Sequence, residues 1–399
     1  MCQLSLDGRR IIARTAFVST YPPRRCGIAT FTHDLATAVG DREIVALHLP
    51  DGPIPYPMEV QHRIRADLRT EYLDAARALN DCGAEVVSVQ HEYGIWGGPA
   101  GSFVLDFVRQ LRRPFVATLH TVLRNPSPLQ RDVLAELAHR AAASVVMSRA
   151  AASLLPSAYG VAPDLIEIIP HGVPHMPLVP PDRARPRLGL RRGPVILSFG
   201  LLGPGKGYES VIEAMPAVAR EFPTVRFVVL GATHPDLLRL EGEAYRRRLE
   251  ERASTLGVAK HVLFVDRFVG QAELTAWLTA ADIFVTPYPN LDQIVSGTLS
   301  NAMGAGKAIV STPYAYAAEM LEGGRGRLVA PGSPAALADG FLELLRDDHL
   351  RAKLGLLAYR RSRPMLWPEV AERYRAVFRR AVGSMAPALA GRQVGTVRG

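Results

Sequence analysis

The side chains best suited to chemistry gather between residues 291 and 320, where small, hydroxyl and amide residues mix. The segment SGTL precedes a run that predicts a helix, and the first backbone amides of a helix have no partner within it. Such amides attract an anion, so this helix start is suited to a phosphate. Polar side chains around it are suited to the hydroxyls of the same ligand. The residues concerned are Gly297, Thr298 and Leu299 for the phosphate, and Gln293, Asn301 and Glu319 for the hydroxyls.

Two of these residues, Gln293 and Asn301, are amides rather than carboxylates. An amide orients a hydroxyl by hydrogen bonding, but it has no charge and cannot act as a base or a nucleophile. Any proton transfer must then come from elsewhere, with His120 or the phosphate of the ligand as candidates.

A glycine loop in SFGLLGPGKGYES is the second candidate phosphate site. Gly200 to Lys206 matches the first seven positions of a Walker A loop, G-x-x-x-x-G-K. The next residue is Gly207, whereas a P-loop places there the Ser or Thr hydroxyl that holds magnesium. What remains is a backbone cradle beside the cation of Lys206, which suits a diphosphate.

Strand ends elsewhere carry further polar residues. His120 closes the strand PFVATLH, and His91 closes EVVSVQH with Glu92 directly after it. Neighbouring strand ends converge on one crevice in parallel α/β sheets, so these side chains are expected to lie close together. His171 is a third strand-end imidazole. It is a weaker candidate, because it lies where the chain turns toward the Pro- and Arg-rich segment that follows. Arg267 also follows a strand, where it could meet a base or phosphate or cap a helix.

The elements that position these residues alternate between β-rich and helical segments, which is typical of α/β folds with parallel sheets. A segment rich in Pro and Arg, residues 174–194, separates two such series and predicts a hinge. Two doubly wound, Rossmann-like domains are therefore expected, with ligands at the carboxyl ends of the strands and an interdomain cleft between the facing edges. The predicted strands are residues 14–20, 43–49, 85–91, 114–120, 143–148 and 166–172, then 194–200, 225–231, 261–267, 282–288, 307–312 and 326–331.

Length and composition agree with the prediction of two domains. The 399 residues exceed the size of one typical core, and 48% hydrophobic with 21% charged residues suits a soluble globular protein. No apolar run approaches the ~20 residues of a membrane span, and the N-terminus lacks the core of a secretion signal, so a cytoplasmic location is expected. Cys2, Cys26 and Cys82 have unrelated spacings that predict neither disulfides nor a zinc site.

The net charge of +9 would suit phosphorylated ligands, an anionic membrane surface or nucleic acid. The arginines are dispersed, without interleaved aromatic residues or a nucleic-acid-binding module, so no nucleic-acid partner is predicted.

In order along the chain, these motifs resemble the retaining GT-B glycosyltransferases of the glycosyl transferases group 1 type, family 4. The resemblance spans nearly the whole chain and includes STYPPRRCGIATFTHDLA, VATLH, IIPHGV, SFGLLGPGKGYESVIEAM, AADIFVTPY and SNAMGAGKAIVSTP. It implies an N-terminal acceptor-binding domain at 1–180, joined by a final helix at about 367–383, and a C-terminal nucleotide-sugar-binding domain at 190–366.

The resemblance also implies roles for individual residues. Lys206 would bind the donor diphosphate in a loop shaped by Gly203 and Gly205, and His120 would lie near the anomeric centre as the second catalytic residue. Gly27, in a glycine loop before a helix, would approach the donor, while His91 and Glu92 are candidates for the acceptor side. Residues 297–299 would hold the distal phosphate, and Gln293, Asn301, Glu319 and Arg267 would complete the donor site.

Two positions depart from the family pattern. Leu201 stands where the family often has an Arg that assists its Lys, and the E-x7-E pair of the family falls on Gln293 and Asn301. Leu201 leaves less cationic stabilisation of the leaving group, unless Arg267 or another residue supplies it. The two amides argue against a covalent carboxylate intermediate and leave front-side attack, in which the leaving diphosphate helps deprotonate the acceptor. No Asp-x-Asp pair occurs, which suits a transferase with neither metal nor cofactor.

The expected function is thus transfer of a hexose, from a GDP-mannose or UDP-glucose class of donor, to a saccharide or lipid-linked sugar, with possible peripheral membrane contact. The alternatives are a nucleotide-sugar epimerase or phosphorylase on the same scaffold, or a non-catalytic nucleotide-sugar-binding protein, which the two amides favour. Donor base, sugar, acceptor, linkage and oligomeric state are left open by the sequence.

Overall fold

The computed structural model describes residues 13–48, 54–190 and 193–393. Cys2 and the N-terminal segment examined for a secretion signal lie outside the described residues. The chain divides into two compact units, one formed by Met1–Gly172 with Trp367–Gly399 and the other by Val173–Leu366. Among the described helices, none combines the length and apolarity that a membrane span needs.

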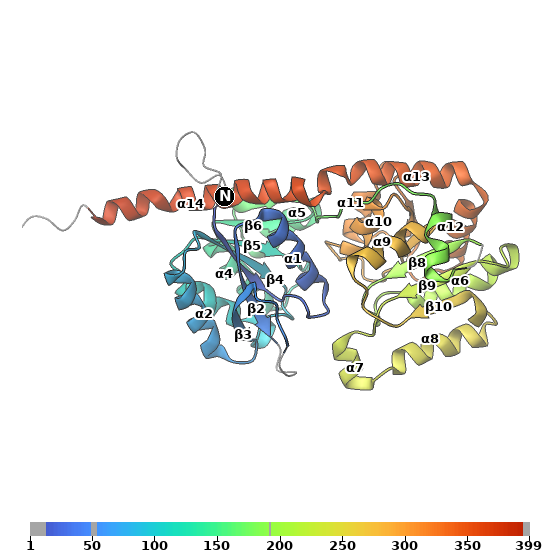
Figure 1. The fold of residues 1–399 in the computed structure, drawn as a ribbon, viewed down its shortest axis with the longest axis horizontal. Helices are drawn as coiled ribbons and strands as arrows, with labels where there is room; N and C mark the ends of the chain where they lie inside the picture. Colours follow the sequence, from blue (N-terminus) through green and yellow to red (C-terminus); the bar gives the residue numbers. More distant parts are fainter. Residues whose placement is uncertain (1–12, 49–53, 191–192, 394–399) are drawn as a thin grey trace, which may run out of the picture. The chain divides into compact units, whose positions relative to one another are not determined.

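The first unit is built on a seven-stranded parallel sheet in the order β3-β2-β1-β4-β5-β6-β7 (Figure 1). Its central strands β1, β4 and β5 are wholly buried, as expected for a parallel sheet covered by helices on both faces. The strands are β1 (Thr15–Ser19), β2 (Arg42–His48), β3 (Val60–Arg65), β4 (Val86–His91), β5 (Phe115–Leu119), β6 (Ala143–Val146) and β7 (Ile166–Ile168). The helices are α1 (Gly27–Val39), α2 (Arg69–Asp81), α3 (Phe103–Gln110), α4 (Pro128–Arg140), α5 (Arg149–Tyr159) and α14 (Trp367–Gln393).

The final helix, α14, belongs to this first unit, where it packs against α1 (Figure 1). Arg375 on α14 donates to the carbonyl of Val39 at the end of α1, at 3.1 Å. Phe378, one turn further, meets Phe17 of β1 edge to face, with ring centroids 6.2 Å apart. The last helix is therefore part of the core of the first unit.

One strand, β3, was missed from the sequence. Its residues VQHRIR bury only Val60 and Ile64, because the strand lies at the edge of the sheet with His and Arg side chains outward. An edge strand with charged residues lacks the continuous apolar run of the central strands.

The second unit contains a six-stranded parallel sheet in the order β10-β9-β8-β11-β12-β13. Alternate strand residues enter the two core layers on its faces: Ile196 of β8 joins one, and Val195 and Leu197 join the other. The strands are β8 (Val195–Phe199), β9 (Arg226–Leu230), β10 (Val262–Val265), β11 (Ile283–Thr286), β12 (Ala308–Ser311) and β13 (Arg327–Leu328). The helices are α6 (Tyr208–Glu221), α7 (Pro235–Glu241), α8 (Ala244–Thr255), α9 (Gln271–Ala280), α10 (Gly297–Gly304), α11 (Ala315–Leu321), α12 (Pro334–Arg346) and α13 (Asp348–Arg361).

Each sheet has one point where the strand order reverses: between β1 and β4 in the first unit, and between β8 and β11 in the second. Ligands of doubly wound sheets bind at such a switch point, beyond the carboxyl ends of its two strands. Most of the residues singled out from the sequence end or follow these four strands, while His120, His171, Arg267 and Glu319 follow β5, β7, β10 and β12.

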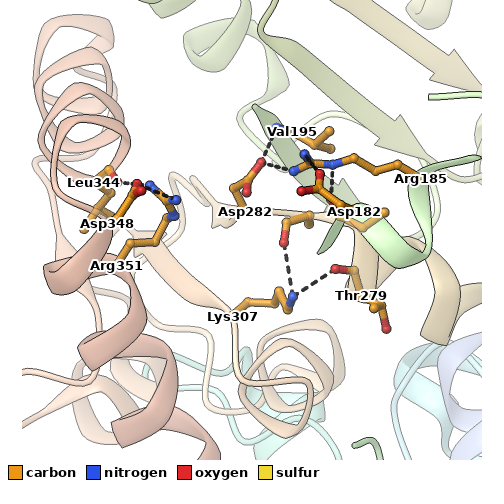
Figure 2. Close-up of polar contacts among 11 residues, drawn as sticks. Asp182, Arg185, Val195, Thr279, Asp282, Lys307, Leu344, Asp348 and Arg351 are labelled. Atoms are coloured by element: carbon orange, nitrogen blue, oxygen red, sulfur yellow. Dashed lines mark hydrogen bonds and ion pairs between the residues drawn. The ribbon is translucent and has the colours of Figure 1, made fainter. Parts of the chain in front are cut away.

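The segment predicted to be a hinge, residues 174–194, belongs to the second unit, where buried Arg185 anchors it (Figure 2). Arg185 pairs with Asp282 at 2.5 Å and donates to the carbonyl of Ala280, at the end of α9. The ammonium of buried Lys307 donates to the carbonyls of Thr279 and Ala281, at 3.1 Å each. The boundary expected between residues 180 and 190 therefore lies inside the second unit, because Arg185 attaches this segment to the end of α9 and to Asp282.

Candidate functional site

The glycine loop after β8 is shaped by backbone angles that favour glycine. Gly205 has φ of 84° and Gly207 has φ of 72°. A Cβ on Gly207 would lie 2.1 Å from the carbonyl oxygen of Pro287, in the loop after β11. The Ser or Thr of a P-loop has no room here, because the two loops of the switch point touch at this position. A Cβ on Gly203, by contrast, would meet its nearest neighbours at 3.9 Å.

Lys206, between those two glycines, places its ammonium 4.5 Å from the centre of the Tyr288 ring. Within the described part of the chain, no carboxylate forms an ion pair with Lys206. Lys206 is half-buried as a residue, and its ammonium lies over an aromatic face, which attracts a cation without neutralising it. Its charge is thus available to an anionic ligand.

Tyr288 also contacts the start of α10. Its hydroxyl lies 3.0 Å from the Thr298 hydroxyl, which lies 3.0 Å from that of Ser296. Ser296 is the N-cap of α10 and accepts from the backbone amide of Leu299 at 3.2 Å. The expectation that the Leu299 amide is free was therefore wrong, because a hydroxyl at the N-cap takes it. The amides of Gly297 and Thr298 have no acceptor among the described residues.

The amides of Gln293 and Asn301 each donate to a backbone carbonyl of the same segment. Gln293 Nε2 donates to the carbonyl of Val295, and Asn301 Nδ2 donates to that of Gly297, both at 2.8 Å. A carboxylate has no hydrogen to donate and would face the carbonyl with repulsion. The buried oxygen Oδ1 of Asn301 has no partner in the described structure and remains able to accept from a ligand hydroxyl.

Glu319 lies on α11, whose first turn is attached to the same loop. The backbone amides of Ala315 and Tyr316 donate to the carbonyls of Leu291 and Gln293, at 2.9 and 3.1 Å. The Tyr316 hydroxyl is 2.8 Å from that of Ser300 on α10. The structure thus fixes the helix of Glu319 against the predicted phosphate loop.

Arg267 lies apart from this group. It forms a two-pronged ion pair with Glu273, in the first turn of α9, and its side chain is 56% exposed. An exposed pair of this kind is worth at most about 1 kcal/mol, so an anionic ligand could compete for the guanidinium.

In the first unit, Gly27 is the first residue of α1. The thiol of Cys26 caps this helix by accepting from the Ala29 amide at 3.3 Å. A Cβ on Gly27 would meet nothing within 4 Å, so the glycine leaves open space at the helix start.

His120 and His91 lie side by side at the ends of β5 and β4, where the amide of His120 donates to the carbonyl of His91 at 2.9 Å. His120 Nε2 is 2.9 Å from Gln90 Oε1, and Gln90 Nε2 donates to Ser88 at 3.1 Å. Burial lowers the pKa of His120 to about 3, with His171 and His91 adding to the effect. Burial also lowers the pKa of His91 to about 4, and neither ring nitrogen of His91 has a hydrogen-bond partner in the described structure. Both imidazoles are therefore neutral at pH 7.

Glu92, the next residue, accepts from the amide of Gly94 at 2.8 Å, while burial raises the pKa of its carboxyl. His171 joins a ring cluster around Phe31 of α1, which lies 4.9 Å from His120, 5.1 Å from His171 and 5.3 Å from Trp367 between ring centroids. Burial lowers the pKa of His171.

Sequence reasoning missed Tyr288 and Gln90. Tyr288 ends the segment DIFVTPY and Gln90 precedes His91, so the rule that polar residues at strand ends form the site applies to both. The prediction named only the charged and imidazole groups nearby and did not include the Tyr ring or the Gln amide.

The cysteines and carboxylates do not gather into a metal site: over the residues that the structure describes, no three His, Cys, Asp or Glu side chains are placed to hold a metal ion. Cys26 and Cys82 are both free thiols.

Comparison with known families gives two matches. The family described as Glycosyltransferase Family 4 matches residues 26–175, and the one described as Glycosyl transferases group 1 matches residues 193–347. These ranges contain every residue that the sequence singled out for the site, from Gly27 to Glu319.

Among curated relatives, a GDP-mannose-dependent alpha-(1-6)-phosphatidylinositol monomannoside mannosyltransferase of Mycolicibacterium smegmatis is 30% identical over 277 residues, 66% of this chain and 69% of the relative. A phosphatidyl-myo-inositol mannosyltransferase of Mycobacterium tuberculosis is 29% identical over 200 residues, so the match spans about half of that protein (49%). A D-inositol 3-phosphate glycosyltransferase of Xylanimonas cellulosilytica is 31% identical and covers 65% of this chain and 64% of the relative.

Among solved structures, sucrose-phosphate synthase from Thermosynechococcus elongatus has a TM-score of 0.77 at 18% identity, covering 93% of this chain and 100% of that one. Anabaena HepE in complex with UDP and glucose has a TM-score of 0.74 at 18% identity, covering 90% and 98%. These likenesses show the fold, two Rossmann-like domains as in GT-B glycosyltransferases. With the family matches and the mannosyltransferase relative, they establish that this chain belongs to glycosyltransferase family 4, the glycosyl transferases group 1, and is a glycosyltransferase.

Proposed function

We propose that this chain transfers a hexose of the mannose or glucose class from a nucleotide diphosphate sugar to a saccharide or lipid-linked acceptor. One observation carries the proposal: the unneutralised cation of Lys206 lies at a switch point, against the Tyr288 ring whose hydroxyl contacts the start of α10. A cation and free helix-start amides on neighbouring loops suit the charge that develops on a leaving diphosphate.

The relatives suggest the first substrates to test. The Mycolicibacterium relative is named for GDP-mannose and phosphatidylinositol monomannoside, and the Mycobacterium tuberculosis relative for phosphatidyl-myo-inositol. The Xylanimonas relative is named for D-inositol 3-phosphate. We therefore place GDP-mannose and an inositol-containing acceptor first, with UDP-glucose as the competing donor.

In the proposed reaction, the bond between the anomeric carbon and the β-phosphate oxygen breaks while the acceptor oxygen attacks the same face. The acceptor proton passes to an oxygen of the leaving diphosphate, and configuration is retained. Lys206 and the amides of Gly297 and Thr298 stabilise the diphosphate, and Gln293, Asn301 and Glu319 orient hydroxyls of the donor. No carboxylate nucleophile is needed at residues 293 or 301.

His120 is proposed to bind a hydroxyl of the donor sugar rather than to remove a proton. An imidazole with a pKa of about 3 is too weak a base for efficient proton transfer near pH 7. It remains a good neutral hydrogen-bonding group. Gly27 is assigned to the donor side, and His91 and Glu92 to the acceptor side.

The two units divide the task in this proposal: the second holds the nucleotide diphosphate of the donor, and the first, completed by α14, holds the acceptor. A lipid-linked acceptor would bring the protein to a membrane surface by peripheral contact. The alternatives of epimerase, phosphorylase and non-catalytic binding protein are not favoured, since the relatives are named transferases.

The test incubates the purified chain with GDP-mannose or UDP-glucose and with phosphatidylinositol in vesicles or inositol 3-phosphate in solution, in the presence and absence of excess EDTA. We expect transfer with one donor, an α-linked product from the α-linked donor, and equal rates with EDTA. Conversion of the donor without any acceptor would indicate an epimerase. Donor binding without turnover on a broad acceptor panel would indicate a binding protein, and loss of transfer in EDTA would contradict metal independence.

A further inference from the structure

Tyr288 is the residue that joins the two halves of the proposed diphosphate site, and neither the family pattern described above nor the comparisons assign it a role. It is 2% exposed and lies just beyond β11, on one side of the switch point. The glycine loop with Lys206 lies beyond β8, on the other side. These two loops are separated by some eighty residues of sequence, so their alignment depends on tertiary contacts.

Two contacts align them. Gly207 touches the carbonyl of Pro287 so closely that a Cβ would lie 2.1 Å away, which fixes the backbones of the loops against each other. Tyr288 then offers its ring to Lys206 at 4.5 Å and its hydroxyl to Thr298 at 3.0 Å. A single rigid side chain thus sets the separation between the cation and the first turn of α10.

The ring itself has little freedom. It stacks on Tyr314, with centroids 5.1 Å apart and planes 26° from parallel. The hydroxyl of Thr312 donates to the backbone carbonyl of Tyr288 at 2.5 Å. Both contacts come from the segment after β12, so the end of a third strand holds Tyr288 in place.

We propose that Tyr288 is a positioning residue that aligns the Lys206 ammonium with the amides of Gly297 and Thr298, so that one diphosphate engages all three. The proposal rests on the proposed function of the same site. The ring holds the ammonium, and the hydroxyl fixes the position of the ring relative to α10. A ligand that binds only one of the two loops would not require this alignment.

The test is a double-mutant cycle with Tyr288→Leu and Lys206→Ala, read out as the Kd of GDP and of UDP by calorimetry on the full chain. If Tyr288 acts through Lys206, Tyr288→Leu raises the Kd about tenfold in the unaltered protein and less than twofold in the Lys206→Ala background, because coupled residues are not additive. Equal effects in both backgrounds would overturn the proposal and leave Tyr288 a packing residue.

Two further variants separate positioning from general stability. Tyr288→Phe keeps the ring that holds the ammonium and loses the hydroxyl that contacts Thr298, so we expect a Kd between those of the unaltered chain and Tyr288→Leu. Tyr245→Leu removes a comparably buried tyrosine of the same unit, on α8, whose hydroxyl donates to Glu209 and which takes no part in the contacts of Tyr288 described above. We expect it to lower Tm with less than a threefold change in Kd, and a Tyr245→Leu Kd as weak as that of Tyr288→Leu would contradict a specific role. If the unaltered chain binds neither nucleotide, the proposed function itself fails. If it binds a nucleotide but the effects of Tyr288→Leu and Lys206→Ala on Kd are additive, only the role of Tyr288 is refuted.

Discussion

Asn301 Nδ2 donates to the carbonyl of Gly297 at 2.8 Å, one helical turn back on α10. Gln293 makes the corresponding bond to Val295 at the other end of the same segment. Amides at these positions are thus suited to the local backbone, since each satisfies a carbonyl that a carboxylate would repel. Their remaining oxygens can still accept from hydroxyls.

Asn301→Asp tests this account of the amides. It places a carboxylate oxygen against the carbonyl of Gly297, which is expected to cost about 1–3 kcal/mol. We expect Tm to fall by several degrees and the Kd of the donor nucleotide to rise about tenfold. The matched control is Asn290→Asp in the preceding loop, where the side-chain oxygen accepts from the Asp292 amide and an Asp keeps that bond. An Asn301→Asp variant that binds donor as well as the control does would refute the account.

Gly207→Ala tests the contact between the two loops. The added Cβ would meet the Pro287 carbonyl at 2.1 Å, at a residue with φ of 72°. We expect a loss of at least about 2 kcal/mol of unfolding free energy, because strain and overlap add. Gly203→Ala, in the same loop with its nearest contact at 3.9 Å, should change unfolding free energy by less than about 1 kcal/mol. Chemical denaturation of both variants gives the comparison, and equal losses would show that loop contact is not the cause.

The strand-end rule located most of the site from sequence, because parallel sheets deliver their carboxyl ends to one edge. It placed Lys206 and residues 297–301 beyond the two strands of the second switch point, and His91 and His120 at the ends of the neighbouring strands β4 and β5. It could not reveal that Ser296 takes the Leu299 amide or that Glu273 holds Arg267, since both depend on side-chain geometry. The edge strand β3 was not predicted for a different reason: half of its residues are exposed to solvent, so its sequence resembles a polar loop.

The buried histidines predict an acid-sensitive first unit. The pKa of His91 is about 4 in the folded protein against an ordinary value of 6.5, so the unfolded chain binds more protons between those values. The stabilisation from the neutral imidazole is complete above pH 6.5 and declines as pH falls toward 4, by roughly 1 kcal/mol per pH unit.

His91→Phe should flatten this dependence. Denaturant unfolding of the unaltered chain and of the variant at pH 7.5, 6 and 5 measures the slopes, and the two should differ only below pH 6.5. Parallel slopes at low pH would mean that His91 is protonated in the folded state.

Lys307 predicts a change in the free energy of unfolding at alkaline pH. Burial lowers its pKa to about 8 from an ordinary 10.5, while its ammonium satisfies two carbonyls at the end of α9. Because the unfolded chain holds the proton more tightly, the contribution of this group to the unfolding free energy rises as pH increases from about 8 to 10.5.

Lys307→Met removes that titration and leaves the two carbonyls unpaired. We expect a loss of about 1–3 kcal/mol at pH 7 and a flatter pH dependence above pH 8, measured by denaturant unfolding. A variant that is as stable as the unaltered chain at pH 7 would show that the lysine is dispensable to α9.

The central claim, that Lys206 stabilises a leaving diphosphate, is tested most directly by the rate of hexose transfer by Lys206→Ala. Lys353→Ala, an exposed lysine on α13 of the same unit, is the matched control. The account predicts a loss of at least about 100-fold in kcat/KM for Lys206→Ala, with Tm unchanged and Lys353→Ala fully active. Near-normal turnover by Lys206→Ala would contradict it.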